Sequence, residues 1–253
     1  MFKKRLADTL RKTFNTFGLE IRLIKNIRKA QRKEKEAKEQ KKYQTLAQFA
    51  ISSILDIGAN EGQFAKTIRT VFPTATIYSF EPLPDVYERM CLVCAEDSRI
   101  KTFNLALGNE MGIKQMFKSS FSPSSSMLTM SDLHKQEWPD SSVNTVVEVE
   151  STTLDSWIKK YEQILNDDFL IKLDVQGYEL AVIQGGVSTF KKARLVIIEV
   201  SFYEFYENQS LFDDIYNCMK NLGFVYRGNL EQFNSKNDHK IIFADAIFEN
   251  VEL

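Results

Sequence analysis

The sequence contains few of the residues that cross-link chains or bind metals. Its 253 residues include only 3 Cys and 2 His, and three cysteines cannot form the disulfide framework of a secreted protein. Cys91 and Cys94 form a C-x-x-C pair, but no second pair or nearby histidine completes a metal or redox site, so we interpret them as small buried helix residues. No run approaches about 18 apolar residues, and no apolar segment of a secretory signal follows the charged N-terminus. These absences indicate a soluble, cytoplasmic protein.

Charge is distributed unevenly along the chain. The formal net charge is −1, but residues 1–42 hold 15 Lys and Arg against 5 Asp and Glu. The rest of the chain is therefore acidic, and the overall balance gives no reason to expect binding to nucleic acid. With 43 % hydrophobic residues, the chain can bury a large core. The composition predicts one α/β domain over residues 51–253, which follows a basic helical arm over residues 1–50.

The arm begins with a predicted amphipathic helix. Its apolar stripe has the three- and four-residue spacing of a helix face and consists of Phe2, Leu6, Leu10, Phe14 and Phe17. Residues 25–42 follow with a strongly basic, solvent-exposed pattern. Such a combination can bind peripherally to an anionic membrane, here the inner membrane face, or it can pack on the domain or on a second copy of the chain. We favour packing, since amphipathic stripes usually serve cores and interfaces.

The domain alternates predicted strands and helices, which is typical of βαβ units with a parallel sheet. We expect strands over residues 53–57, 76–80, 100–105, 169–175 and 195–200, and two more near 224–227 and 241–248. Helices are expected over residues 44–50, 63–71, 84–96, 179–190 and 211–222. Residues 109–150 contain a serine-rich stretch and one candidate strand over 143–149, but no regular alternation. We therefore predict an insertion there that covers the substrate.

A glycine turn follows the first strand. Residues 56–62 read DIGANEG, and Gly58 and Gly62 let a ligand approach the backbone closely. The G-x-x-x-G spacing differs from the G-x-G-x-x-G of dinucleotide folds, so a pyrophosphate site is disfavoured. Glu81 ends the second strand, where a carboxylate can accept hydrogen bonds from both hydroxyls of a ribose. A ribose occurs in NAD and in S-adenosylmethionine alike, and the glycine spacing favours S-adenosylmethionine.

An ordered series of motifs resembles the FkbM-type methyltransferases. Besides DIGANEG, the motifs are Phe80-Glu81-Pro82, Ala106-Leu107-Gly108, SSSMLTM (124–130), Thr153-Leu154-Asp155, IKLDVQGYE (171–179), EVSF (199–202), Tyr206-Glu207 and ADAIF (244–248). The resemblance implies a Rossmann-like class I methyltransferase fold, with a seven-stranded, mostly parallel sheet whose last strand is antiparallel. It also implies transfer of a methyl group from S-adenosylmethionine to a hydroxyl, often on a sugar, a glycan or a polyketide. The expected cofactor contacts are Asp56, Gly58, Asn60, Gly62, Phe64, Glu81, Pro82, Ala106 and Leu107.

Three side chains are candidates for catalysis. Asp174 and Glu199 end the fourth and fifth core strands, at the edge where open α/β sheets bind ligands. There they can take a proton, orient an acceptor hydroxyl or hold Mg²⁺. His134, in the insertion, is either a general base over the acceptor or a surface residue of a mobile loop. The expected acceptor contacts are Ser124, Ser125, Ser126, Gln176 and Tyr178.

Two other functions are weighed against methyl transfer. An NAD-dependent oxidoreductase or epimerase is disfavoured, because the G-x-G-x-x-G turn and a Tyr-x-x-x-Lys pair are both missing. A non-catalytic protein that binds the cofactor and docks a membrane or partner through its arm would be distinguished by a lack of turnover.

Overall fold

The computed structural model describes residues 31, 37, 38, 40–161, 165 and 168–253. The chain divides into two compact units, residues 1–41 and 42–253. The apolar stripe predicted over residues 2–17 lies outside the described residues. The second unit begins before the predicted boundary at residue 51, because Tyr43 and Leu46 are already buried in its core around the short helix η1 (Gln44–Gln48). No helix among the described residues is long and apolar enough to cross a membrane.

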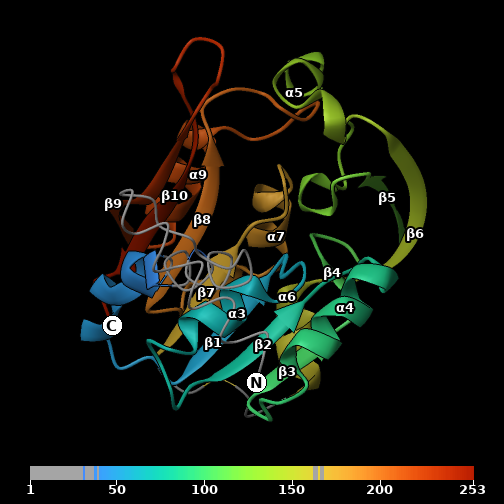
Figure 1. Cartoon of the computed structure of the whole chain (residues 1–253). Coiled ribbons are helices and arrows are strands. Elements are labelled where there is room, and N and C mark those ends of the chain that lie inside the picture. The colour runs from blue at the N-terminus through green and yellow to red at the C-terminus, as the bar shows by residue number, and fades with distance from the viewer. Residues whose placement is uncertain (1–30, 32–36, 39, 162–164, 166–167) are drawn as a thin grey trace, which may run out of the picture. The chain divides into compact units, whose positions relative to one another are not determined.

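A seven-stranded sheet forms the centre of this second unit (Figure 1). In spatial order the strands are β3 (Ile100–Phe103), β2 (Thr76–Phe80), β1 (Ser53–Ile57), β7 (Phe169–Leu173), β8 (Leu195–Ser201), β10 (Ile241–Asn250) and β9 (Phe224–Asn234). β10 runs antiparallel to both of its neighbours, β8 and β9, and the other six strands all run in one direction. The predicted sheet, mostly parallel with an antiparallel last strand, is confirmed.

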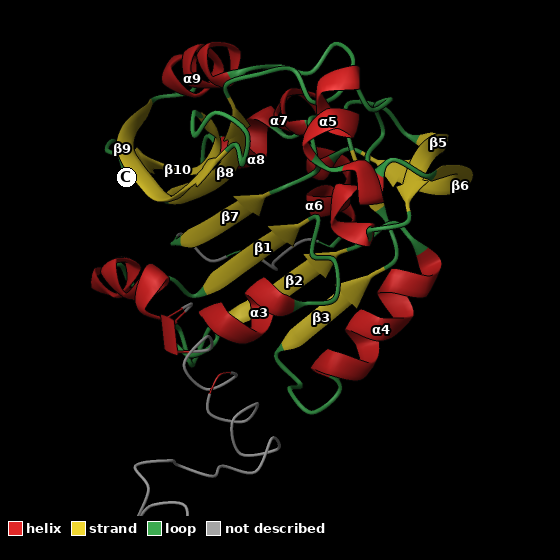
Figure 2. Ribbon diagram, turned by 45° about the horizontal axis from the view of Figure 1, so that its top comes forward, coloured by secondary structure: helices red, strands yellow, loops and turns green. Residues whose placement is uncertain are grey.

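Helices cover both faces of the sheet (Figure 2). They are α3 (Gln63–Ile68), α4 (Pro84–Cys94), α6 (Leu154–Lys160), α7 (Glu179–Gly185), α8 (Val187–Phe190) and α9 (Phe212–Asn221). Successive residues of a strand point to opposite faces. Ile54 of β1 accordingly packs in a core with α3 and α4, whereas Leu55 packs in a second core with α6, α7 and α9. Burial on both faces explains why these strands are almost continuously apolar.

The insertion is more regular than predicted. It contains a second sheet with the order β4-β6-β5, together with one α-helix and two short 3₁₀ helices. Their bounds are β4 (Ala106–Leu107), β5 (Gly112–Ser119), η2 (Ser122–Ser124), α5 (Asp132–Glu137), η3 (Pro139–Ser141) and β6 (Asn144–Thr152). The expected third strand therefore ends at Phe103, since the chain leaves the main sheet there. The helix expected over 179–190 is interrupted at Gly186, whose Cβ position would lie 3.0 Å from two atoms of Leu154.

Gly62 has a structural role in the turn after β1. Its φ is +81°, and a Cβ there would lie 2.8 Å from the Sγ of Cys94 and 3.4 Å from the Cγ of Met90, both on α4. The space that a Cβ would occupy is therefore filled by α4, which corrects the reason given above for this glycine, and its contact with the cofactor stays a prediction. Cys94 is buried at this contact, in agreement with its interpretation as a packing residue.

Gly62→Ala should destabilise the protein by about 1–2 kcal/mol from the left-handed backbone and by roughly 1–3 kcal/mol from overpacking. Denaturant unfolding measures the sum. Gly223→Ala is the matched control, because Gly223 has a similar φ of +95° and no atom closer than 3.8 Å to its Cβ position. Adding Cys94→Ala should recover part of the loss at Gly62 only. A loss at Gly62 no larger than that at Gly223 would contradict this packing account.

Candidate active site

Two cavities lie at the carboxyl edge of the parallel strands and share one wall. The first cavity is lined by the β1 turn, the end of β2 and residues 105–107; the second lies between α5 and the β9–β10 hairpin. Asp174, Gln176 and Pro123 line both. In open α/β sheets, ligands bind at this edge. Two ligands bound here would therefore meet at Asp174.

Glu81 is the main polar group of the first cavity. It is only 5 % exposed, and its carboxylate accepts hydrogen bonds from the backbone N–H of Asn60 (3.0 Å) and of Leu83 (2.9 Å). Each carboxylate oxygen can accept a further bond, so the group can still receive two hydroxyls. Burial raises the pKa of Glu81 to about 7, against the opposing effect of the two N–H donors. This arrangement suits the ribose predicted from the sequence.

The predicted cofactor residues divide into two groups. Those that line the first cavity are Gly58, Asn60, Glu81, Pro82, Ala106 and Leu107. Asp56, Gly62 and Phe64 are not among its lining residues. A Cβ on Gly58 would lie 1.8 Å from the backbone oxygen of Asp174, so this glycine lets the β1 turn approach the β7 loop. Phe64 instead packs edge-on against Tyr43 in the core.

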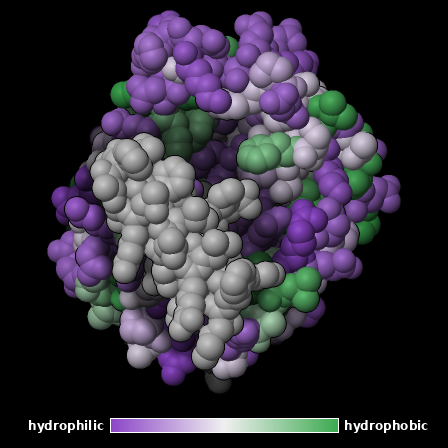
Figure 3. Space-filling model, viewed as in Figure 1, coloured by the Kyte–Doolittle hydropathy of each residue, from purple (hydrophilic) through white to green (hydrophobic). Residues whose placement is uncertain are grey.

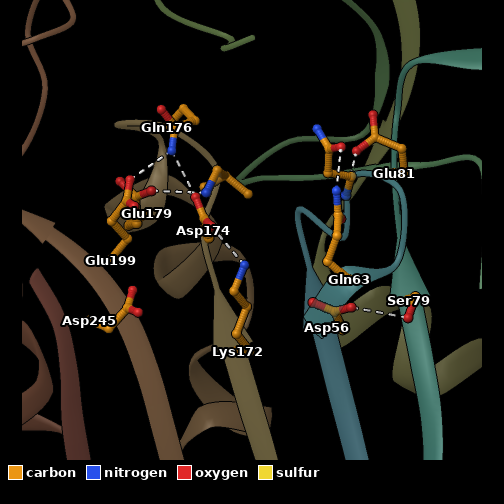
Figure 4. Close-up of polar contacts among 12 residues, drawn as sticks. Asp56, Gln63, Ser79, Glu81, Lys172, Asp174, Gln176, Glu179, Glu199 and Asp245 are labelled. Atoms are coloured by element: carbon orange, nitrogen blue, oxygen red, sulfur yellow. Dashed lines mark hydrogen bonds and ion pairs between the residues drawn. The ribbon is translucent and has the colours of Figure 1, made fainter. Parts of the chain in front are cut away.

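A chain of buried polar groups forms the wall between the cavities (Figure 4). The Nζ of Lys172, on β7, donates to Oδ2 of Asp174 at 2.8 Å. The Nε2 of Gln176 donates to Oδ1 of Asp174 (2.8 Å) and to Oε1 of Glu199 (2.7 Å). One amide thus holds the two strand-end carboxyl groups next to each other. The structure brings together the predicted residues Asp174, Glu199 and Gln176.

The two carboxyl groups differ in protonation. Burial opposes ionisation of Asp174, but the charge and hydrogen bond of Lys172 hold the pKa of Asp174 below its usual range. For Glu199, burial and then the charges of Asp174, Asp245 and Glu179 raise the pKa well above its usual range. The carboxylate form of Asp174 is therefore stabilised, whereas the surroundings of Glu199 favour its protonated form. Asp56 lies on the neighbouring strand β1, opposite Lys172, and burial raises its pKa to about 6.

The loop that carries Gln176 is held by two residues without a predicted role. Gln176 has a φ of +55°, which is uncommon outside glycine. Buried Glu179 accepts from the backbone N–H of Val175 and of Gly177, and so fixes this turn. The hydroxyl of Tyr206 lies 2.9 Å from Oε1 of Gln176 and orients its amide.

The second cavity has aromatic walls and a polar floor. Its ring-bearing residues are Phe121, His134, Trp138, Phe205, Tyr206, Phe233 and Phe243. Figure 3 shows the surface hollowed between the β9–β10 hairpin and α5, where this cavity lies. Its other lining residues are Pro123, Ser124, Asp174, Gln176, Glu199, Ser201 and Gln209. No Lys or Arg side chain is among these described lining residues.

His134 is a buried helix residue, which corrects the alternative of a mobile surface loop. It is 2 % exposed, and burial lowers its pKa to about 4, so its ring is neutral at pH 7. Its Nε2 lies 2.9 Å from the hydroxyl of Ser141, whose proton is donated to the carbonyl of Trp138. Nε2 must then donate, which leaves Nδ1 as a buried acceptor with no hydrogen-bond partner.

The predicted acceptor contacts are spread over both cavities. Ser124 lines the second cavity, whereas Ser125 and Tyr178 line the first. Ser126 lines neither, and its hydroxyl donates to the backbone oxygen of Gln176 at 2.6 Å. Lys172 and Tyr206 were missed as site residues, although a lysine two positions before Asp174 in an apolar strand indicates a buried ion pair.

The donor set at the cavity wall does not suit Mg²⁺. Both oxygens of Asp174 already accept from Lys172 and Gln176, and Oε1 of Glu199 accepts from Gln176. Among the described residues, no group of three or more His, Cys, Asp or Glu side chains could hold a metal ion. The roles of Asp174 and Glu199 are therefore assigned without a metal ion.

The strand order, the glycine turn after β1 and the carboxylate at the end of β2 define a Rossmann-like class I methyltransferase fold. The chain belongs to the FkbM methyltransferase family: residues 56–226 match the model of the methyltransferase FkbM domain. It therefore carries an S-adenosylmethionine-dependent methyltransferase domain, and the resemblance found in the sequence is confirmed.

The chain is also similar to individual proteins. The 2-O-methyltransferase NoeI of Sinorhizobium fredii is 32 % identical over 171 residues, which cover 62 % of this chain and 66 % of NoeI, just under two thirds of that relative. Among solved structures, the N-methyltransferase NodS of Bradyrhizobium japonicum in complex with S-adenosyl-L-homocysteine is 11 % identical, with 87 % of each chain covered and a TM-score of 0.47. A putative RNA methyltransferase of Pyrococcus horikoshii is 12 % identical, with 86 % and 85 % covered and a TM-score of 0.44. At these TM-scores, the structural likeness carries no inference about this chain.

Cofactor binding should weaken at low pH, because ribose hydroxyls prefer the ionised carboxylate of Glu81, whose pKa is about 7. The probe is 5′-methylthioadenosine, which has the ribose but not the amino acid of the cofactor. Its affinity, measured by calorimetry from about pH 8 to about pH 5, should fall below pH 7 and approach a tenfold loss per pH unit.

Glu81→Gln should remove this pH dependence and weaken binding by roughly tenfold or more. Glu61→Gln is the control, since Glu61 belongs to the same turn but pairs with Arg89 at 2.7 Å and is not a lining residue. An affinity independent of pH in the unmodified protein would rule out Glu81 as the ribose partner.

Proposed function

We propose that the protein transfers the methyl group of S-adenosylmethionine to a hydroxyl of an uncharged sugar ring, either free or within a glycan. The observation that supports this most directly is the shared wall: the cavity with Glu81 and the cavity with aromatic walls meet at an ionised Asp174. The NoeI relative is named as an O-methyltransferase, which is consistent with a hydroxyl acceptor.

The protein's task in this reaction is to place and deprotonate the acceptor. When bound, the cofactor supplies a methyl group that its sulfonium already activates, so rate enhancement comes mainly from alignment. Glu81 and Asn60 would hold the ribose end of the first cavity, with Leu105–Leu107 beside it. The methyl donor would then face the wall formed by Asp174 and Gln176.

Asp174 is the proposed general base. A hydroxyl oxygen becomes strongly acidic as it bonds to the methyl carbon, so a carboxylate of low pKa can still take its proton. Lys172 keeps Asp174 ionised, and Gln176 fixes the direction of the carboxylate. Burial and the neighbouring carboxylates favour the protonated form of Glu199, which would donate a hydrogen bond to a second oxygen of the acceptor. The pair thus resembles other sites in which environment separates the roles of two carboxyl groups.

The cavity walls support a neutral sugar. A sugar ring has apolar C–H faces and polar edges, and the second cavity offers aromatic walls around a floor of Asp174, Gln176 and Glu199. The absence of Lys and Arg among the described lining residues disfavours a phosphate or carboxylate on the reacting ring. His134 is a weaker candidate for the base than the sequence suggested, because its Nε2 is already hydrogen-bonded to the hydroxyl of Ser141 and its Nδ1 is buried.

Formation of S-adenosylhomocysteine with a panel of acceptors tests this function. Neutral glycosides should be methylated, whereas sugar phosphates and uronic acids should react at least about tenfold more slowly, because nothing at the cavity neutralises their charge. A polyketide-like alcohol methylated faster than every sugar would contradict the sugar assignment. No turnover with any acceptor would favour the non-catalytic alternative.

Two variants assign the base within the same assay. Asp174→Asn should lower kcat by about 100-fold or more while the affinity for the cofactor stays within a few-fold. His134→Gln is the comparison, and its kcat should change by less than about tenfold. If His134→Gln lost more activity than Asp174→Asn, the roles given to the two residues would be wrong.

A further inference from the structure

Glu199 is flanked by carboxyl groups on two sides. Asp174 is joined to it by the amide of Gln176. On the other side, β10 places Asp245 directly opposite Glu199 in antiparallel register, so that both side chains project from the same face of the sheet. Figure 4 shows Asp245 below Glu199, with both on the same side of Lys172 and Asp174.

Lys42 supplies the counter-ion of Asp245. Its Nζ lies 2.5 Å from Oδ2 of Asp245 and 2.9 Å from Oε2 of Glu231, and the side chains of Lys42 and Asp245 are 13 % and 14 % exposed. Lys42 is also close to the ring of the buried Tyr43, which packs on Phe64. A residue that precedes β1 is thus fixed beside a strand near the end of the chain.

The charges around Glu199 form two lysine–aspartate pairs, and Glu199 lies between them. The groups on the elements packed against it are Asp56 (β1), Lys172 and Asp174 (β7 and its loop), Glu179 (α7), Tyr206, Glu231 (β9), Asp245 (β10) and Lys42. Lys172 pairs with Asp174, and Lys42 pairs with Asp245. Removal of Lys42 would leave the Asp245 carboxylate without its ammonium partner next to Glu199, and an unpaired buried charge is costly.

We propose that Lys42 is a positioning residue of the active site: it holds the charge of Asp245 away from Glu199 and Asp174, and so keeps Asp174 free to accept the proton of the acceptor. This catalytic consequence rests on the proposed function. The effect on the protonation of Glu199 does not, and it can be measured without a substrate.

The ¹³C carboxyl shift of Glu199, assigned with Glu199→Gln in the ligand-free full-length protein, reports its titration. Lys42→Met should move the midpoint to higher pH by on the order of one unit. Lys42→Met with Asp245→Asn should return it close to that of the unmodified protein, because the unpaired carboxylate is gone. Lys42→Arg should leave the midpoint of the Glu199 titration unchanged. Lys41→Met is a control at an exposed neighbouring lysine and should also leave the midpoint unchanged. Lys42→Gln replaces Lys42→Met if the latter does not fold, with the same expected shift.

The rate of methyl transfer is measured with the same variants. With a neutral glycoside, Lys42→Met should lower kcat/KM at neutral pH by roughly three- to tenfold with unchanged cofactor affinity, and Asp245→Asn should restore it. An unchanged Glu199 titration, or a shift that Asp245→Asn does not reverse, would overturn the proposal even if the protein methylates sugars. A shifted titration with unchanged kcat/KM would also overturn it. If no acceptor is methylated, the proposed function fails, and the titration alone decides the role of Lys42.

Discussion

The ammonium of Lys172 and the carboxylate of Asp174 meet 2.8 Å apart on one face of the sheet, between β1 and β8. Neither charge would be stable there alone, because a buried ion without a partner costs several kcal/mol. Burial alone would lower the pKa of Lys172, but the charges of Asp174 and Asp56 raise it above its usual value. The pair keeps one carboxylate ionised at the junction of the two cavities, and the amide of Gln176 then joins this carboxylate to Glu199, whose pKa is raised by burial and by the neighbouring carboxylates.

The same face of the sheet carries the other acidic groups of the site. Asp56 and Glu199 lie on the two strands that flank β7, and Asp245 lies one strand further, opposite Glu199. Lys172 thus stabilises the charge of Asp174, whereas Glu199 has carboxyl groups on both sides. This is a division of roles that two carboxyl groups in water would not show.

The sequence was sufficient for the main sheet, because apolar runs followed by glycine, proline or acidic residues mark the carboxyl ends of strands such as Ser53–Ile57 and Thr76–Phe80. It also located Glu81, Asp174 and Glu199. It did not show β5, whose exposed strand has little apolar periodicity, and it did not show that α4 fills the space beside Gly62. The aromatic walls and the Lys42–Asp245 pair could not be predicted from the sequence. The tertiary fold alone brings Trp138 next to Phe243, and Lys42 next to Asp245.

The central claim is that two ligand sites share the wall at Asp174. A crystal structure of the protein with S-adenosylhomocysteine and a neutral glycoside tests it most directly. The account predicts the ribose hydroxyls within hydrogen-bond distance of Glu81, and an acceptor hydroxyl between the cofactor sulfur and the carboxylate of Asp174, with the sugar ring against the aromatic walls. A ribose bound away from Glu81, or an acceptor hydroxyl outside the reach of Asp174, would contradict it.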